Sequence, residues 1–484
     1  MSIRLCLPVL ASLAVSSADA AAETLKQAIL RALVGNPSIN AQRASLRATK
    51  EKLPQARSGY FPKVYATANF GFDELTTRFP ATAGAWTSTT SQTHPKGAGL
   101  QMSLNLFDGW RTPNSVSQSK QLIESSAENL RAQEQQTIVD AASAYLNVLR
   151  ASELQDIYKD NAGFIAEQYR VIAARHAFGD VTRSDLALAQ ARLAIARSQH
   201  IAASASLAQS RAIYQQTIGD EPANLVPPAP IDRVVAMDLD AALRLANQQH
   251  PAIKAALSAA LLQVKIARGE FAPQIGLAAS LGKQFDTQTR GDTQLTGTIR
   301  GQVTVPLFDG GLISSKSREA SQIAAQRQLE ADAVQAQVRA AVMTGWNQLA
   351  TGKAQVASAQ MQVAAAQNAR ASMGEEYRFG QRTLLDVLNS QQDLLTARSN
   401  LAFAEHDRVL ASFALAQATG LLTLTNVVSA LDKSVAPRAS ALIVGRDFPL
   451  RRTLDEKLFV RGNAAVKYPT PLADKTQNWL LRTY

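Results

Sequence analysis

Apolar and polar residues alternate along two stretches of the chain, and this period of two is typical of β-strands. The alternating runs lie at 64–72 and 100–106 in the first stretch and at 275–281 and 299–305 in the second. Each run approaches the ~9–11 residues that a tilted membrane-spanning strand needs. Polar loops, 73–96 and 286–294, separate the runs of each stretch. The pattern predicts four strands, in β-hairpins at about 61–107 and about 273–308.

Elsewhere, apolar residues recur every three to four positions with alanine between them, which is typical of helices that pack as coiled coils. The segments 114–177 and 313–377 contain no proline, and a rise of 1.5 Å per residue makes each a helix of roughly 95–100 Å. We expect each to form an antiparallel hairpin with a shorter helix that follows a glycine turn. The shorter second helices and the helices that lead into the strands are expected at 182–217, 383–418, 23–59 and 238–271.

The order of these elements occurs twice. The strand end Leu106-Phe107-Asp108-Gly109 recurs as Leu307-Phe308-Asp309-Gly310, and the same spacing relates the turn Phe178-Gly179 to Phe379-Gly380. One spacing is not maintained by chance over such a length, so the chain contains an internal duplication. We place the first copy at 21–226 and the second at 227–420.

The N-terminal segment 1–20 has the layout of a secretory signal peptide. A basic residue, Arg4, precedes an apolar stretch, and small residues end the segment at Ala18-Asp19-Ala20. The single cysteine, Cys6, lies inside the segment, too early for an acylation site. We therefore expect an exported chain without disulfides, thiolate metal sites or a lipid anchor.

The C-terminal segment 421–484 has no counterpart in the duplication. It is rich in proline and carries more Lys and Arg than Asp and Glu, so it contributes to the net charge of +11. We interpret it as a basic, loosely ordered periplasmic extension. Hydrophobic residues make up 46% of the sequence. After the N-terminal segment, however, no apolar run is long enough for a membrane-spanning helix.

The strands allow two interpretations, surface hairpins or membrane strands. Export and the small polar residues on one side of each strand favour a membrane barrel. However, four strands cannot close a barrel, and lipid does not tolerate an open sheet edge. If the strands span a membrane, several chains have to contribute to one barrel, and oligomerisation follows from the strand count.

No pattern in the sequence predicts catalysis. The chain lacks the metalloprotease, serine-hydrolase and P-loop motifs, and its five histidines are scattered without ligand spacing. We expect no enzyme activity, no catalytic residue, no cofactor, no metal site and no nucleic-acid partner.

The duplicated order, the two Leu-Phe-Asp-Gly strand ends and the turn from Tyr377 to Leu388 resemble the TolC family of outer-membrane exit channels. The resemblance covers about 23–420. It implies an α+β fold, namely a homotrimeric duct with a shared 12-stranded transmembrane β-barrel, four strands per chain, in outer-membrane lipid. Coiled-coil helical hairpins would form a tunnel through the periplasm.

The resemblance also implies functional residues at the helical turns. Asp386 matches a position of the carboxylate rings that narrow the family's tunnel entrance, whereas Asn389 departs from the second ring position. We therefore expect a weak cation site here rather than strong cation block. Contacts between an inner and an outer hairpin hold the entrance closed in the family, and the matching positions are Tyr377, Arg382, Ser184 and Asp185. We hypothesise that Arg382 and Tyr377 hold Asp185.

The resemblance implies a passive duct that joins an inner-membrane ABC or proton-driven transporter through a periplasmic adaptor. The lack of an acylation cysteine favours type I protein secretion, and small-molecule or drug efflux is the alternative. A periplasmic coiled-coil scaffold whose hairpins never enter lipid is the alternative of another class.

Overall fold

The computed structural model describes residues 23–80, 84, 86–235, 238–255, 258–287 and 291–431. The chain divides into two compact units, Met1–Ser434 and Val435–Tyr484, and only the first contains described residues. The predicted signal peptide and most of the predicted extension lie outside the described residues.

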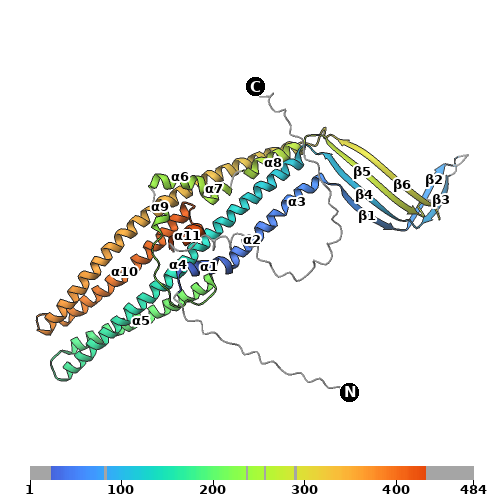
Figure 1. Ribbon diagram of the computed structural model, residues 1–484. Helices are drawn as coiled ribbons and strands as arrows, with labels where there is room; N and C mark the ends of the chain where they lie inside the picture. Colours follow the sequence, from blue (N-terminus) through green and yellow to red (C-terminus); the bar gives the residue numbers. More distant parts are fainter. Residues whose placement is uncertain are drawn as a thin grey trace, which may run out of the picture. The chain divides into compact units, whose positions relative to one another are not determined.

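Two helical hairpins make up most of the first unit (Figure 1). The first hairpin consists of α4 (Arg111–Ala177) and α5 (Arg183–Ile218), and the second of α9 (Leu312–Arg378) and α10 (Leu384–Ala418). Helices α4 and α9 have 67 residues each, which makes them roughly 100 Å long. Shorter helices are α1 (Leu25–Gly35), α2 (Pro37–Lys50), α3 (Lys52–Arg57), α6 (Leu239–Gln249), α7 (Pro251–Ala255), α8 (Ser258–Gly269) and α11 (Leu424–Leu431), with 3₁₀ turns η1 (Ser58–Tyr60) and η2 (Asp232–Val235).

The segments that lead into the strands are broken helices rather than the continuous ones we expected. The first break is at Asn36 and the second at His250, each directly before a proline. Proline has no backbone N–H and forces the preceding residue into an extended conformation. Asn36 and His250 adopt ψ angles of 122° and 126°, and Asn36 then caps α2 by accepting a hydrogen bond from the Ser38 N–H.

An antiparallel sheet of four strands connects the two copies. Its members are β1 (Lys63–Phe70), β4 (Lys96–Phe107), β5 (Gln274–Phe285) and β6 (Thr293–Thr304), in the order β1-β4-β5-β6. Strands β4 and β5 pair across the two copies, while among the described strands β1 and β6 each have one edge without a partner.

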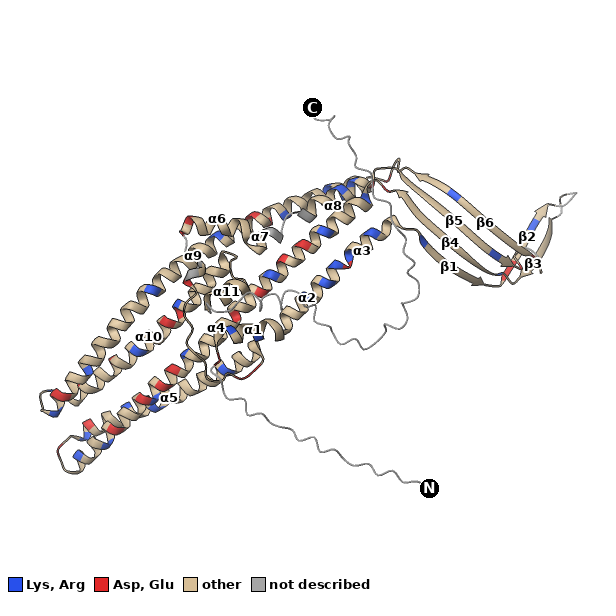
Figure 2. Ribbon diagram, in the orientation of Figure 1, with Lys and Arg blue, Asp and Glu red and all other residues tan. Residues whose placement is uncertain are grey.

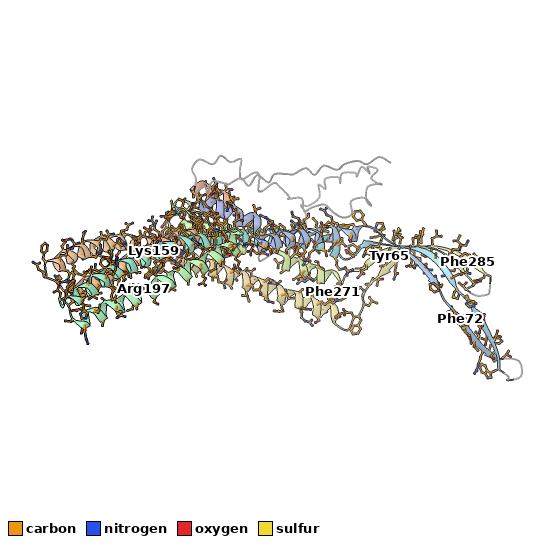
Figure 3. The ribbon with its side chains drawn as sticks, turned by 90° about the horizontal axis from the view of Figure 1, so that it is seen from below. Tyr65, Phe72, Lys159, Arg197, Phe271 and Phe285 are labelled. Atoms are coloured by element: carbon orange, nitrogen blue, oxygen red, sulfur yellow. The ribbon has the colours of Figure 1, made fainter. Side chains whose placement is uncertain are left out.

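The two faces of this sheet differ in chemistry. The register places Val64, Met102, Ala279 and Ile299 in one cross-strand row and Tyr65, Gln101, Ser280 and Thr298 in the next. We call these the apolar face and the polar face. Aromatic residues lie toward both ends of the sheet: Tyr65 near the helical end, and Phe72 and Phe285 toward the opposite end (Figure 3).

The loop predicted at 73–96 is wrong in part, because it contains a second β-hairpin. Strands β2 (Asp73–Pro80) and β3 (Trp86–Thr93) form a separate two-stranded sheet. Threonine and serine fill most positions of β3 and two of β2, and the hydroxyls of Thr76 and Thr90 are 2.9 Å apart across the strands. Alternation of apolar and polar residues cannot identify a hairpin whose side chains are exposed on both faces.

The main apolar core lies midway along the helices. Tyr145 and Tyr214 are fully buried there, and the Tyr145 hydroxyl oxygen lies 2.7 Å from the carbonyl oxygens of both Glu23 and Val226. These contacts attach the first described residues and the connection between the two copies to α4. Helix α11 packs into the same core through Val427, so the structured part of the chain extends past the boundary we expected at 420.

None of the described helices is long and apolar enough to cross a membrane.

The repeated Asp-Gly motif joins each sheet strand to a long helix. The Asp108 carboxylate accepts hydrogen bonds from the backbone N–H and the hydroxyl of Thr112 at 2.9 and 2.6 Å. Asp309 accepts in the same way from the backbone N–H groups of Gly311 and Ile313. These bonds satisfy amide groups of the first helical turn that have no partner within the helix. The motif therefore fixes the point at which each long helix begins.

The glycines of the two motifs have the same backbone conformation and different surroundings. Gly109 and Gly310 have φ angles of +70° and +67°, but a Cβ on Gly109 would overlap the Gly269 carbonyl oxygen, whereas nothing lies within 4 Å of one on Gly310. We expect Gly310→Ala to cost about 1–2 kcal/mol per chain from the left-handed conformation alone. Gly109→Ala costs more, because α8 has to move. Thermal unfolding of the two purified variants measures the difference, and equal midpoints would contradict this account.

Candidate functional site

The candidate site is the pair of turns at the ends of the two hairpins. In the first turn, Gly179 has φ +80° and its N–H donates to the His176 carbonyl at 3.0 Å. In the second, Gly380 has φ +75° and its N–H donates to the Tyr377 carbonyl at 3.0 Å. Glycine adopts this left-handed conformation without steric cost, so the two turns have the same form.

Each second helix begins with a capping box. The Thr383 hydroxyl accepts from the Asp386 N–H, and the Asp386 carboxylate accepts from the Thr383 N–H at 3.0 Å and its hydroxyl at 2.8 Å. Thr182 and Asp185 form the same arrangement at the start of α5. The predicted entrance residue Asp386 and the predicted lock residue Asp185 are therefore the same capping residue in the two copies.

The environment of Asp386 keeps it ionised. Hydrogen bonds from the Thr383 backbone and hydroxyl, followed by the nearby Arg382 guanidinium, lower the pKa of Asp386 below its ordinary value of 3.8. Because the pKa is lowered, the cap stabilises α10 fully at pH values above the ordinary pKa. This contribution to stability is lost as the pH falls through the lowered pKa. Arg382 also offsets part of the negative charge at this site.

Arg382 forms its ion pair within its own turn. Its Nε lies 2.7 Å from the Glu376 Oε2, and this bond raises the pKa of Arg382. The predicted contact between Arg382 and Asp185 is not formed within the chain, because Asp185 caps α5 and Arg382 pairs with Glu376. Ser184 is exposed, and no interaction is recorded for its side chain among the described residues.

Tyr377 does connect the two hairpins, with a different partner from the one we expected. The Arg175 guanidinium at the end of α4 donates to the Tyr377 hydroxyl at 3.3 Å. Two further bonds cross between the hairpins: Arg192 donates to the Asn389 side-chain oxygen at 3.4 Å, and the Gln391 amide donates to the Asn161 oxygen at 3.0 Å. The structure thus brings Tyr377 and Asn389 into one set of cross-hairpin contacts.

An apolar seam lies beneath these polar contacts. Ile165, Ile172 and Leu193 of the first hairpin pack with Leu384 and Leu388 of the second. Asn161 and Gln391 are the buried polar pair next to this seam, with exposed fractions of 4% and 9%. Burial makes their hydrogen bond more important, because a separated buried amide would lose its partner without gaining water.

A small cavity of about 120 Å³ adjoins this buried pair. Arg370 of α9 lines it and stacks over the Phe164 ring of α4, with the guanidinium carbon 4.6 Å from the ring centroid. Within the described ranges, no group of three or more His, Cys, Asp or Glu side chains is arranged to hold a metal ion. The described contacts join the two hairpins through side-chain hydrogen bonds, a cation–π pair and apolar packing.

The family model described as outer membrane efflux protein matches residues 14–219 and 242–421. This match covers most of the chain and both copies of the duplication.

The chain belongs to the outer membrane efflux protein family.

Individual relatives agree with this membership. The outer membrane efflux protein BepC of Brucella suis biovar 1 is 35% identical over 410 residues, which cover 84% of this chain and 87% of BepC. The alkaline protease secretion protein AprF of Pseudomonas aeruginosa is 25% identical over 358 residues, covering 72% and 71%. The crystal structure of the Campylobacter jejuni CmeC outer membrane channel has a TM-score of 0.72 at 18% identity, covering 87% of this chain and 88% of CmeC.

Family membership confirms several expectations. The fold is the α+β fold of TolC-like trimeric ducts, the protein is a passive channel rather than an enzyme, and it lies in the outer membrane with its helical tunnel in the periplasm. Channels of this family work with an adaptor and an inner-membrane transporter. The alternative of a periplasmic scaffold that never enters lipid is wrong for a member of this outer-membrane family.

Sequence reasoning missed Arg175, Arg192 and the pair Asn161–Gln391. Their spacing along the chain carries no signal, because each contact depends on how the second hairpin, α9 and α10, lies against the first, α4 and α5. Glu376 could have been found, since a charge one turn before a glycine turn readily meets an opposite charge just after it. Pairing of Arg382 with Glu376 needs only the form of the turn itself.

Removing the Arg175 side chain is expected to widen the entrance. Arg175→Ala breaks the bond to Tyr377 at the end of the hairpin, so single-channel conductance in a planar bilayer should rise. Arg378→Ala is the matched control, because Arg378 pairs with Glu375 of its own helix at 3.1 Å. An Arg175→Ala conductance no higher than that of the control would disprove the role of this contact.

Cation binding at the entrance is expected to be weak and insensitive to pH between 7 and 5. The lowered pKa of Asp386 keeps this carboxylate ionised over that range, and Asn389 adds no charge. Current block by a trivalent cation added from the helical side measures the binding. Asp386→Asn should abolish the block and Asn389→Asp should strengthen it. Block that persists in Asp386→Asn would place the cation site elsewhere.

Proposed function

We propose that three copies of this chain form an exit duct for type I protein secretion, fed by an ABC transporter through a periplasmic adaptor. The observation that carries the proposal is the similarity to AprF, a protein named for alkaline protease secretion, over 72% of this chain. The position of the single cysteine, Cys6, also favours the unlipidated members of the family.

Closure at the helical turns is part of the proposal. Asp386 and Asn389 lie at the entrance, and Tyr377 closes it through Arg175 instead of through Asp185. Arg382 acts within its turn, where it stiffens the connection between α9 and α10 by pairing with Glu376. An adaptor that engages this end would open the duct by separating the two hairpins along the seam.

Small-molecule efflux is the second candidate. It is favoured by the 35% identity to BepC, a protein named as an outer membrane efflux protein. A passive duct takes its cargo from its transporter, so both candidates use the same trimer and the same entrance. They differ in the transporter that delivers the cargo.

A deletion strain distinguishes the two candidates. For type I secretion, we expect the strain to lose one or more proteins from the culture supernatant, with its inhibitory drug concentrations unchanged. The full-length chain should restore secretion, and the deletion strain that carries the empty vector serves as the control. Increased drug sensitivity with an unchanged set of secreted proteins would contradict the proposal and support efflux.

A further inference from the structure

The four strands of the main sheet carry positive charge and no carboxylate. Their charged residues are Lys63, Lys96, Lys283 and Arg300, and neither Asp nor Glu occurs in β1, β4, β5 or β6. Figure 2 shows blue bands along these strands, whereas acidic residues lie near their ends. The nearest acidic residues in the chain, such as Asp108, Asp286 and Asp309, belong to the connections at the ends of the strands.

The register divides these cations between the two faces. Arg300 lies opposite Ala278, which lies opposite Ser103, which lies opposite Lys63, and this row belongs to the polar face. Lys96 and Lys283 belong to the apolar face, at the end of the sheet away from the helices. Lys96 pairs there with Asp286 at 3.4 Å, and the Lys283 ammonium lies 5.1 Å from the centre of the Phe285 ring.

Arg300 is therefore a mid-strand cation on a face of threonine, serine, glutamine and glycine. Its side chain is exposed, and no ion pair is recorded for it within the described part of the chain. In a membrane barrel the apolar face meets lipid and the polar face lines the lumen. An arginine placed in mid-strand toward lipid would be costly, and the alternation avoids this by placing it in the lumen.

We propose that Arg300 forms a ring of three positive charges inside the barrel, which concentrates anions and the anionic groups of cargo. The inference rests on the trimeric channel proposed above. Rings of arginine or lysine produce anion preference in pores because they raise the local anion concentration. Lys63 lies in the same row at the beginning of β1 and adds to the field at the helical end of the barrel.

The expected size of the effect follows from simple electrostatics. Three charges about 10 Å from the axis, screened over a Debye length of about 10 Å at 0.1 M salt, raise the ratio of anions to cations about fourfold. At 1 M salt the Debye length is about 3 Å, so the ratio returns to about one. The barrel and the entrance then prefer ions of opposite sign, since Asp386 attracts cations.

A local chemical probe tests the proposal without depending on the state of the entrance. Gln302→Cys places a thiol on the same face, two residues from Arg300, in a chain whose only other cysteine is Cys6 in the predicted signal peptide. Membrane-impermeant thiosulfonate reagents, one anionic and one cationic, are added from outside to cells that carry this variant. The ratio of their reaction rates reports the local potential.

We expect Arg300→Gln to lower the ratio of anionic to cationic rates about fourfold at 0.1 M salt. Arg300→Lys should preserve the ratio, and 1 M salt should remove the difference. Lys283→Gln is the matched control: it removes the same charge from the same sheet on the apolar face, and should leave the ratio unchanged.

The outcomes separate this inference from the proposed channel. If neither reagent modifies the thiol while the chain is present in the outer membrane, residue 302 does not line a lumen. The proposed channel arrangement is then wrong. If both reagents react and Arg300→Gln leaves the rate ratio unchanged, the channel stands and the charge ring is overturned. A change of the same size in Lys283→Gln would overturn it as well.

Discussion

The unpaired edges of β1 and β6 determine how this chain can enter a membrane. Every backbone N–H and C=O group inside a bilayer needs a hydrogen-bond partner, and each unpaired one costs several kcal/mol. Within the chain, the order β1-β4-β5-β6 leaves one edge of β1 and one edge of β6 without such partners. A single copy therefore cannot insert its sheet stably, and insertion is coupled to assembly. In the trimeric duct, β1 of each chain meets β6 of its neighbour, and the twelve strands close.

Closure of the sheet also fixes the helices. Strand β4 continues into α4 and β6 into α9 through the capped Asp-Gly connections, so the strand spacing sets where the long helices begin. Midway along the helices the packing is dense: Gly345 and Gly352 of α9 lie directly against the backbone of α10 at Leu415 and Arg408. Near the turns, a small apolar seam and a few polar bonds connect the hairpins. The opening proposed above would therefore take place where the fewest contacts have to break.

The elements that depend on local periodicity could be predicted from the sequence. The features that depend on contacts between distant parts of the chain could not. The long helices and the strands of the main sheet follow from the spacing of apolar residues, and the observed bounds of α4 and α9 differ from the predicted ones by at most three residues. The β2–β3 hairpin was missed because its threonine-rich strands bury neither face. At the site, the capping role of Asp386 follows from Thr383 three residues earlier. The Arg175–Tyr377 bond has no local signal, because it depends on the position of one hairpin against the other.

The length of the duct determines how its charged sites combine. About 100 Å of helix separates the turns from the sheet, many times the Debye length of about 8 Å at physiological ionic strength. Charges at Asp386 and at Arg300 therefore cannot cancel each other through space, and they act in series along one path. In series, the narrower site dominates the selectivity of the whole duct. Under the closure and the charge ring proposed above, a closed entrance would give the preference of Asp386, weakened by Arg382, whereas an open one would expose the preference of the barrel. The proposed opening of the hairpins would then change which charge a passing ion meets at the narrowest point, and it would link selectivity to gating.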